Sequence, residues 1–304
     1  MKLTPWHKIF SSFFTIGLIF TACGNNSDQE DSNKIEVVTS FYPIAEFAKM
    51  VGGDKIEVSV LAPIGVEPHD YELSPKDLEL IESSDLLIVQ GAGMEAWFDE
   101  DLEEDLVQKG VYVLIISEHL TLVEGDDEHD EHEKDPHTWL SPLMAIETVK
   151  MIEMQLIQLD PENEADYKTL AEKSIEDLEN LHARFLGQLN SCEQRVILTS
   201  HDAFSYLGEL YGIEIMSIHG ISTEDEPSAQ DLSELISEST AHQLKYLLVE
   251  PGVSSDFSET VSEEAQLKTL ILDTLESPTG ETGSTYIEIM DYNLQTLKEA
   301  MQCQ

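Results

Sequence analysis

The chain has 304 residues, of which 41% are hydrophobic, and its 16 Lys and Arg against 61 Asp and Glu give a formal net charge of −45. The hydrophobic fraction is sufficient for a packed core and excludes a wholly disordered chain. The net charge excludes nucleic acid and anionic lipid headgroups as partners of the surface, because it would repel both, and it leaves cations as the natural ligands.

The N-terminal residues resemble a bacterial lipoprotein signal. Lys2 and Lys8 precede an apolar stretch, 9–20, that is too short to span a bilayer. The tripeptide Thr-Ala-Cys follows directly and ends at Cys23. We expect residues 1–22 to be removed and Cys23 to be lipidated, with 23–33 as a polar tether on the outer face of a cell membrane. Ordinary signal cleavage without a lipid is the alternative.

Predicted strands and helices alternate after the tether, a pattern typical of parallel sheets covered by helices on both faces. The first half contains four predicted strands and three predicted helices: strands 34–41, 55–63, 85–91 and 111–117, and helices 42–53, 74–84 and 94–110. The second half repeats this scheme: strands 195–200, 213–218, 244–250 and 267–273, and helices 203–211, 228–240 and 284–301.

Two long helical stretches, 141–160 and 161–190, lie between the halves. The second has about eight turns at 3.6 residues per turn, enough to reach from one half to the other. The predicted fold class is therefore α/β, with two lobes that each hold a four-stranded parallel sheet flanked by helices, joined by one long rigid helix. We expect an N-terminal lobe at 34–160, the connecting helix at 161–190 and a C-terminal lobe at 191–304.

Histidines and carboxylates stand just past the ends of several predicted strands. His69 and His137 follow strands of the N-terminal lobe, His201 follows the first strand of the C-terminal lobe, and Glu250 and Asp273 end two further strands there. Ligands of open parallel sheets bind beyond the carboxyl ends of the strands, so we expect these groups to converge in the cleft between the lobes. Four other histidines are interpreted as surface, loop or helix residues: His119, His182, His219 and His242.

Three neutral imidazoles and one carboxylate form a strong site for a divalent transition metal such as Zn²⁺. Mg²⁺ and Ca²⁺ prefer oxygen ligands and are disfavoured by so many nitrogen donors. The sequence therefore predicts a transition-metal site made by groups from both lobes.

Five segments resemble, in order, the zinc- and manganese-binding lipoproteins of ABC transporters, the ZnuA-like solute-binding proteins with the TroA-like fold: GVEPHDYELSP, DPHTWLSP, TSHDAFSYLGELYGI, GISTEDEPSAQDL and LLVEPGVSS. The resemblance covers nearly all of 34–302. It implies two lobes with a metal between them and delivery of that metal to an ABC permease with its ATPase. By motif position it assigns His69, His137 and His201 as metal ligands, with Asp273 as the fourth.

Several neighbours of these residues have expected supporting roles. Asp135 either orients His137 through a hydrogen bond or only forms the turn before it. Glu250 is expected behind the ligands, and Trp139 is expected to pack under His137 as a wall. Ser141 replaces the aspartate usual in the resembled motif, and serine can cap a helix there.

We therefore expect an extracytoplasmic, monomeric protein that captures Zn²⁺ and passes it to a permease, without catalysis. The alternatives are a Mn²⁺-specific binding protein of the same fold, a surface adhesin and a zinc hydrolase. The hydrolase is disfavoured because the chain has no HExxH motif, and because Asp273 would occupy the coordination position that a reactive water needs.

Cys192 and Cys303 remain once Cys23 is assigned to the lipid. Cys192 precedes the first predicted strand of the C-terminal lobe, and Cys303 follows the last helix of the same lobe. Outside the cytoplasm such a pair often forms a disulfide. The sequence leaves a disulfide and two free thiols open.

Overall fold

A computed structural model describes residues 34–124, 134–220, 227–251, 256–280 and 282–304. The expected signal, the lipidation at Cys23 and the tether lie outside these residues. The described residues belong to one compact unit, Asn33–Gln304. Among their helices, none combines the length and the apolar character that crossing a membrane requires.

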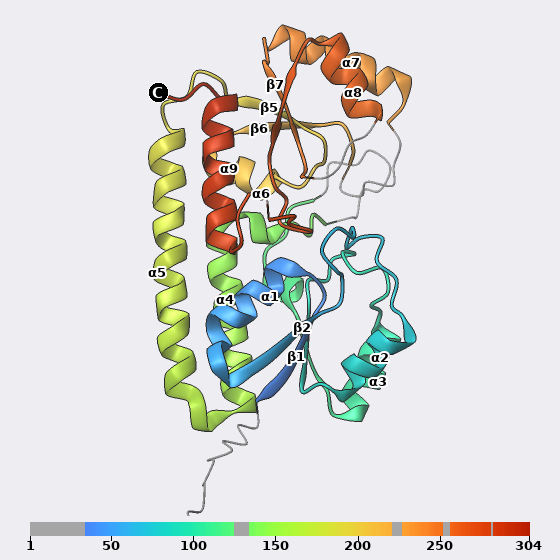
Figure 1. The fold of residues 1–304 in the computed structure, drawn as a ribbon, viewed down its shortest axis with the longest axis vertical. Coiled ribbons are helices and arrows are strands. Elements are labelled where there is room, and N and C mark those ends of the chain that lie inside the picture. The colour runs from blue at the N-terminus through green and yellow to red at the C-terminus, as the bar shows by residue number, and fades with distance from the viewer. Residues whose placement is uncertain (1–33, 125–133, 221–226, 252–255, 281) are drawn as a thin grey trace, which may run out of the picture. The chain divides into compact units, whose positions relative to one another are not determined.

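The first sheet consists of four parallel strands in the order β2-β1-β3-β4 (Figure 1). Its strands and connecting helices are β1 (Ile35–Thr39), α1 (Tyr42–Gly52), β2 (Ile56–Val60), α2 (Pro75–Ser83), β3 (Leu86–Val89), α3 (Glu100–Lys109) and β4 (Tyr112–Ile115). All four residues of β3 are apolar and buried, as expected of a central strand with helices on both faces. The strand order reverses at β1, and polar groups at its carboxyl end therefore face a crevice.

The second sheet repeats this topology, with the order β6-β5-β7-β8. Its elements are β5 (Val196–Thr199), α6 (Ser205–Tyr211), β6 (Glu214–Ser217), α7 (Ala229–Ala241), β7 (Tyr246–Val249), α8 (Asp256–Glu264), β8 (Lys268–Ile271) and α9 (Tyr286–Ala300). The two four-stranded parallel sheets flanked by helices confirm the fold class that the sequence predicts.

Helices α4 (Pro142–Leu159) and α5 (Glu164–Leu189) connect the two sheets through one short 3-10 turn, Pro161–Asn163. Helix α5 packs along α4 and also contacts α1, next to the first sheet, and α9, next to the second. In Figure 1, α5 runs beside α4 for part of its length and beside α9 for another part. The connecting helix is thus packed against both halves, while the lobe boundaries expected from the sequence stay a prediction.

Buried side chains alternate between the two faces of each sheet, as the two-residue period of a strand requires. Val37 enters a core that continues from the first sheet to the second, whereas its neighbour Val38 enters a separate core on the opposite face. Leu198 of the second sheet likewise belongs to a separate outer core. The core common to both sheets, here called the shared core, includes side chains of α1, α4, α5 and α9. Examples from these four helices are Phe47, Ile152, Phe185 and Leu297.

The helix predicted at 94–110 is shorter in the structure, because it begins at Glu100. The Asp99 side chain accepts a hydrogen bond from Leu102 N at 2.8 Å and so defines the N-terminus. Before it, the buried Glu95 carboxylate accepts hydrogen bonds from the backbone N–H groups of Gln90 and Gly91, each at 2.8 Å. These bonds hold the segment in a turn at the end of β3 rather than in a helix.

Three further features of the second half were not resolved by the sequence. Helix α8 was not expected, and the helix predicted from residue 203 begins at Ser205. Cys192 and Cys303 are joined by a disulfide, which links the chain just after α5 to the chain just after α9.

Candidate metal centre

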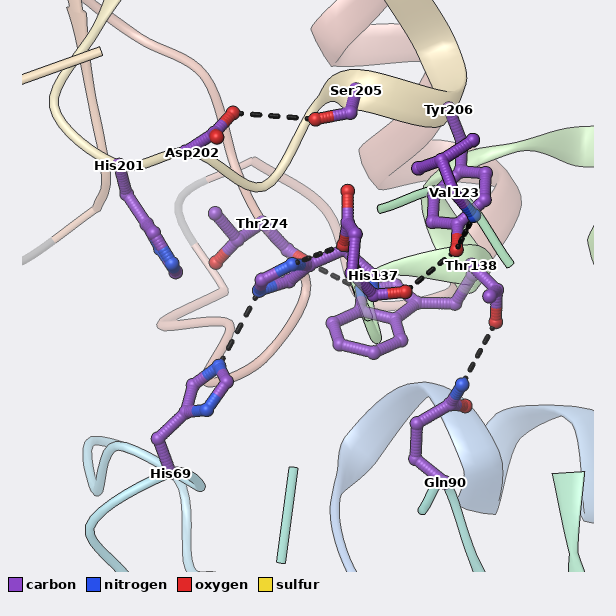
Figure 2. A network of polar contacts seen from close by, with 12 residues as sticks. His69, Gln90, Val123, His137, Thr138, His201, Asp202, Ser205, Tyr206 and Thr274 are labelled. Carbon is purple, nitrogen blue, oxygen red and sulfur yellow. Dashed lines mark hydrogen bonds and ion pairs between the residues drawn. The ribbon is translucent and has the colours of Figure 1, made fainter. Parts of the chain in front are cut away.

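Four side chains from the carboxyl ends of strands in both sheets converge at one point. His69 lies in the loop after β2, and His137 lies after β4, next to the short 3-10 helix Thr138–Leu140. His201 follows β5, and Glu276 follows β8. Their ligand atoms all lie within 4.8 Å of one another. Figure 2 shows the three imidazole rings turned toward a common centre.

His137 is the most enclosed histidine of this cluster, with 0% of its surface exposed. Its Nε2 atom lies 3.4 Å from Nε2 of His69 and 3.0 Å from Oε1 of Glu276. Glu276 Oε1 is buried and has no well-aligned hydrogen bond among the described residues. Nitrogen lone pairs and a carboxylate oxygen held this close repel one another unless a proton or a cation lies between them.

Carboxylates behind two of the rings determine which nitrogen faces the cluster. Asp135 Oδ1 lies 2.8 Å from His137 Nδ1 and accepts a second hydrogen bond from His137 N, also at 2.8 Å. Glu250 Oε1 lies 3.1 Å from His201 Nδ1. A carboxylate at Nδ1 holds a proton there and leaves Nε2 as the donor atom toward a metal. Asp135 and Glu250 therefore lie behind the His137 and His201 rings, in contact with Nδ1 of each.

Asp273, the fourth ligand expected from the sequence, is not in the cluster, and Glu276 lies there instead. Both Asp273 oxygens already accept hydrogen bonds, Oδ1 from Leu275 N at 2.8 Å and Oδ2 from the hydroxyl of Thr282. Leu275 has a φ of 62°, in the left-handed region that is uncommon for residues other than glycine. This bend turns the chain back after Asp273 and directs Glu276 toward His137. The sequence identified the correct strand end but not this bend.

The pKa values of the cluster differ strongly between neighbouring groups. Burial is the largest influence on His69 and lowers its pKa to about 4, so this ring is neutral at pH 7. Burial also disfavours the charged form of His137, but the hydrogen bond to Asp135 and the ion pair with Glu276 outweigh it and raise its pKa to about 9. Burial would raise the pKa of Glu276, yet the ion pair with His137 and the charges of the three imidazoles lower it to about 2. Without a metal, His137 thus carries a proton that a cation would have to displace.

Glu67 is an additional carboxyl group that the sequence did not single out. Its ligand oxygen lies within 4.8 Å of those of Glu250 and Glu276, and its Oε1 accepts a hydrogen bond from His69 N at 3.4 Å. Burial, followed by the charges of Glu276 and Glu250, raises the pKa of Glu67 to about 8. A divalent cation nearby would lower this pKa.

Trp139 forms a wall of the site, as the sequence suggested. Its ring packs 5.1 Å from the His137 ring, between centroids, and its Nε1 donates to Thr274 O at 2.7 Å. The segment that carries His137 is thereby fastened to the segment that carries Glu276. Ser141 stands at the N-cap of α4, the position expected from the sequence, but its side chain makes no capping hydrogen bond.

The other four histidines considered from the sequence lie outside the metal-binding groups found among the described residues. His182 Nδ1 pairs with the Tyr211 hydroxyl at 3.0 Å, and the His219 ring packs edge-on against Phe257. His119 ends a short 3-10 helix, and His242 stands at the C-terminus of α7.

A family model described as "Zinc-uptake complex component A periplasmic" matches residues 37–300. The high-affinity zinc uptake system protein ZnuA of Bacillus subtilis is 35% identical over 314 residues, which cover 97% of this chain and 98% of that protein. The zinc-binding lipoprotein AdcA of Streptococcus pneumoniae is also 35% identical, over 93% of this chain. The chain spans only 58% of the length of AdcA.

Solved structures show the same fold. The Zn(II)-bound ZnuA-like domain of Streptococcus pneumoniae AdcA superposes with a TM-score of 0.76 at 35% identity, covering 88% of this chain and 99% of that one. The laminin-binding protein Lmb of Streptococcus agalactiae, described as bifunctional with adhesin and metal-transporting activity, has a TM-score of 0.79 at 29% identity. That match covers 88% of this chain and 99% of Lmb.

Proposed function

This chain belongs to the family of the periplasmic component A of zinc-uptake complexes, and we propose that it captures Zn²⁺ outside the cytoplasm and delivers it to an ABC permease. The family consists of substrate-binding components of transporters, not of enzymes. The observation that carries the proposal is the set of three imidazole nitrogens and one carboxylate oxygen within 4.8 Å of one another.

The proposed ligands are His69, His137, His201 and Glu276. This donor set supports Zn²⁺, which binds nitrogen and carboxylate ligands tetrahedrally, over Mg²⁺ and Ca²⁺, which need more oxygen donors. Three imidazoles also favour zinc over manganese, since Mn²⁺ binds such ligands most weakly in the Irving–Williams order of first-row metals. Mn²⁺ is therefore proposed as a weaker ligand of the same site.

Four protein donors also argue for binding rather than hydrolysis. A catalytic zinc site keeps one of its four positions for water, whereas this cluster offers a side chain for each. Two further carboxyl groups, Glu67 and Glu250, have ligand oxygens within 4.8 Å of that of Glu276. The site is suited to hold and release an ion.

We propose that lipidation at Cys23 anchors the protein on the outer face of the membrane, where a released ion can reach the permease without diffusing away. The pneumococcal relative described as a lipoprotein supports this assignment. A monomer is sufficient for the binding site, because one chain supplies all four donors. The adhesive alternative stays a prediction.

Metal titration of two carboxylate variants tests the ligand set. Wild-type protein, purified without chelators or a metal-binding tag, is expected to bind one Zn²⁺ per chain. Glu276→Gln should weaken zinc binding by more than about tenfold, because it removes a charged donor. The matched change Asp273→Asn should leave zinc affinity nearly unchanged, since that carboxylate is occupied by Leu275 N and Thr282. A larger loss of zinc affinity in Asp273→Asn than in Glu276→Gln would indicate that Asp273, and not Glu276, is the fourth ligand.

A further inference from the structure

The hydroxyl of Tyr206 connects helix α6 to the chain segment that carries His137. Tyr206 is 5% exposed, and its hydroxyl donates to Asp135 O at 2.6 Å and accepts from Val123 N at 3.2 Å (Figure 2). Burial raises the pKa of this hydroxyl, so it keeps its proton and remains a donor at neutral pH. Both hydrogen-bonding functions of the phenol are therefore used.

Val123 and Asp135 flank the segment 124–134, in which seven of eleven residues are acidic. Asp135 N donates to Val123 O at 3.2 Å, and Glu124 and Lys134 form an antiparallel bridge and an ion pair just beyond them. The Tyr206 hydroxyl contacts the other backbone polar group of each residue, Val123 N and Asp135 O. If Val123 and Asp135 moved apart, the hydroxyl could not keep both hydrogen bonds.

The Tyr206 hydroxyl is linked to the proposed ligand His137 through one residue, Asp135. Asp135 holds His137 through Oδ1 alone, while its buried Oδ2 has no hydrogen bond among the described residues. The direction of the carboxylate therefore depends on where the Asp135 backbone is held. That position is determined by Tyr206 on one side and Val123 on the other.

Tyr206 also lies close in sequence to a ligand from the second sheet. His201 lies in the short connection between β5 and α6, and Tyr206 lies in the first turn of α6, five residues later. The rings of His137 and His201 are 5.0 Å apart between centroids, although they come from different sheets. The stretch from the end of β5 to the first turn of α6 thus supplies a proposed ligand and also the group that holds the backbone next to another.

We propose that Tyr206 is a positioning residue for zinc binding, whose hydroxyl joins Val123 to Asp135 and fixes the His137 segment relative to His201. This inference rests on the proposed function, because it concerns the same metal site. Loss of the hydroxyl leaves Asp135 O and Val123 N without this partner and allows the His137 segment to shift. Outer partners of metal ligands typically change metal affinity by about 10- to 100-fold. We expect an effect near the lower end, since the hydroxyl acts through the Asp135 backbone.

The test compares Tyr206→Phe with Tyr211→Phe. Tyr211 is on the same helix, is similarly buried at 8% exposure, and uses its hydroxyl to pair with His182 outside the metal cluster. For both variants and wild type, the measurements are zinc affinity by competition with a chelator and the rate of zinc release. The visible absorption spectrum of the Co²⁺-substituted protein reports ligand geometry, and thermal unfolding without metal reports the purely structural effect.

Tyr206→Phe is expected to bind zinc about tenfold more weakly, to release it correspondingly faster and to change the Co²⁺ spectrum. Tyr211→Phe should match wild type in all three while losing comparable thermal stability. Equal zinc affinity, release and Co²⁺ spectra in the two variants would overturn the inference. Failure of wild type itself to bind zinc would instead overturn the proposed function.

A measurement on the wild-type chain covers the case in which Tyr206→Phe fails to fold. Zinc holds His137 and, through it, Asp135 and the Tyr206 hydroxyl. Hydrogen exchange of the Val123 amide, which donates to that hydroxyl, should therefore slow when zinc is added. An unchanged exchange rate at Val123 on saturation with zinc would contradict the proposed coupling.

Discussion

Zinc binding should release about one proton even at pH 8, because His137 is protonated in the metal-free protein. With the pKa of His137 raised to about 9, about 0.9 of the molecules carry this proton at pH 8. Glu67, whose pKa is raised to about 8, can add up to about half a proton when the cation lowers that pKa. Three histidines with ordinary pKa values near 6.5 would together release only about 0.1 proton at this pH. The structure therefore predicts about 0.9 to 1.4 protons per zinc.

Calorimetric titration at pH 8 in two buffers with different ionisation enthalpies measures this number directly. Zinc affinity should also rise about tenfold between pH 7 and pH 8, equivalent to about 1.4 kcal/mol, because one proton competes with the cation. A release of about 0.1 proton and a flat affinity over this interval would refute the reasoning.

Two variants identify the source of the proton. Asp135→Asn removes the carboxylate that accepts hydrogen bonds from His137, so the pKa of His137 should fall and proton release at pH 8 should decrease. Asp202→Asn is the control, because that nearby carboxylate pairs with the Ser205 hydroxyl at 3.3 Å. Equal proton release from the two variants would show that Asp135 does not hold the proton on His137.

Three further outcomes follow from the structure. The metal-free protein should lose stability between pH 6.5 and about 9, since His137 keeps its proton up to about pH 9 when folded but only to about 6.5 when unfolded; a melting temperature that stays constant over this range would contradict the assignment. Replacing Cys192 and Cys303 by serine should lower the free energy of unfolding in urea by about 3–5 kcal/mol, because the disulfide links residues 111 positions apart, and a loss under about 1 kcal/mol would argue against it. His201→Glu should weaken zinc binding more than manganese binding, and His201→Ala should weaken both; paired competition titrations measure this, and full zinc affinity in His201→Ala would remove His201 from the site.

The strand pattern was predictable because parallel strands buried on both faces appear as short apolar runs. The segment LLIV of β3 is such a run, and its end predicted the edge at which polar groups gather. The positions of His69, His137 and His201 after strands followed from the same rule. The resemblance of DPHTWLSP and the other segments to a known family added the connection between these separate strand ends.

Local backbone conformation limited the prediction. Asp273 stands directly after a strand, whereas Glu276 reaches the histidine cluster only because Leu275 adopts a left-handed backbone conformation. A leucine side chain gives no indication of that conformation in the sequence. The helix predicted from residue 94 was too long because a long-range role of Glu95, binding backbone N–H groups at the end of β3, outweighs its helix propensity. Tyr206 gave no signal, since an aromatic residue in a helix is most often read as part of the core.

Release of zinc by separation of the two sheets would have a high free-energy cost. Within the shared core, Phe47 of α1 and Tyr286 of α9 pack with ring centroids 4.8 Å apart, and both are almost fully buried. Exposing both rings to water would cost about 5 kcal/mol, roughly ten times thermal energy, before any other contact is broken. His69 is the partly exposed member of the ligand set, and its loop is fastened to the other side by a hydrogen bond from Gly65 N to the Ser277 hydroxyl. We therefore expect transfer of the ion to a permease to begin with displacement of this loop, so that the rate of exchange would report on a local opening rather than on the motion of whole domains.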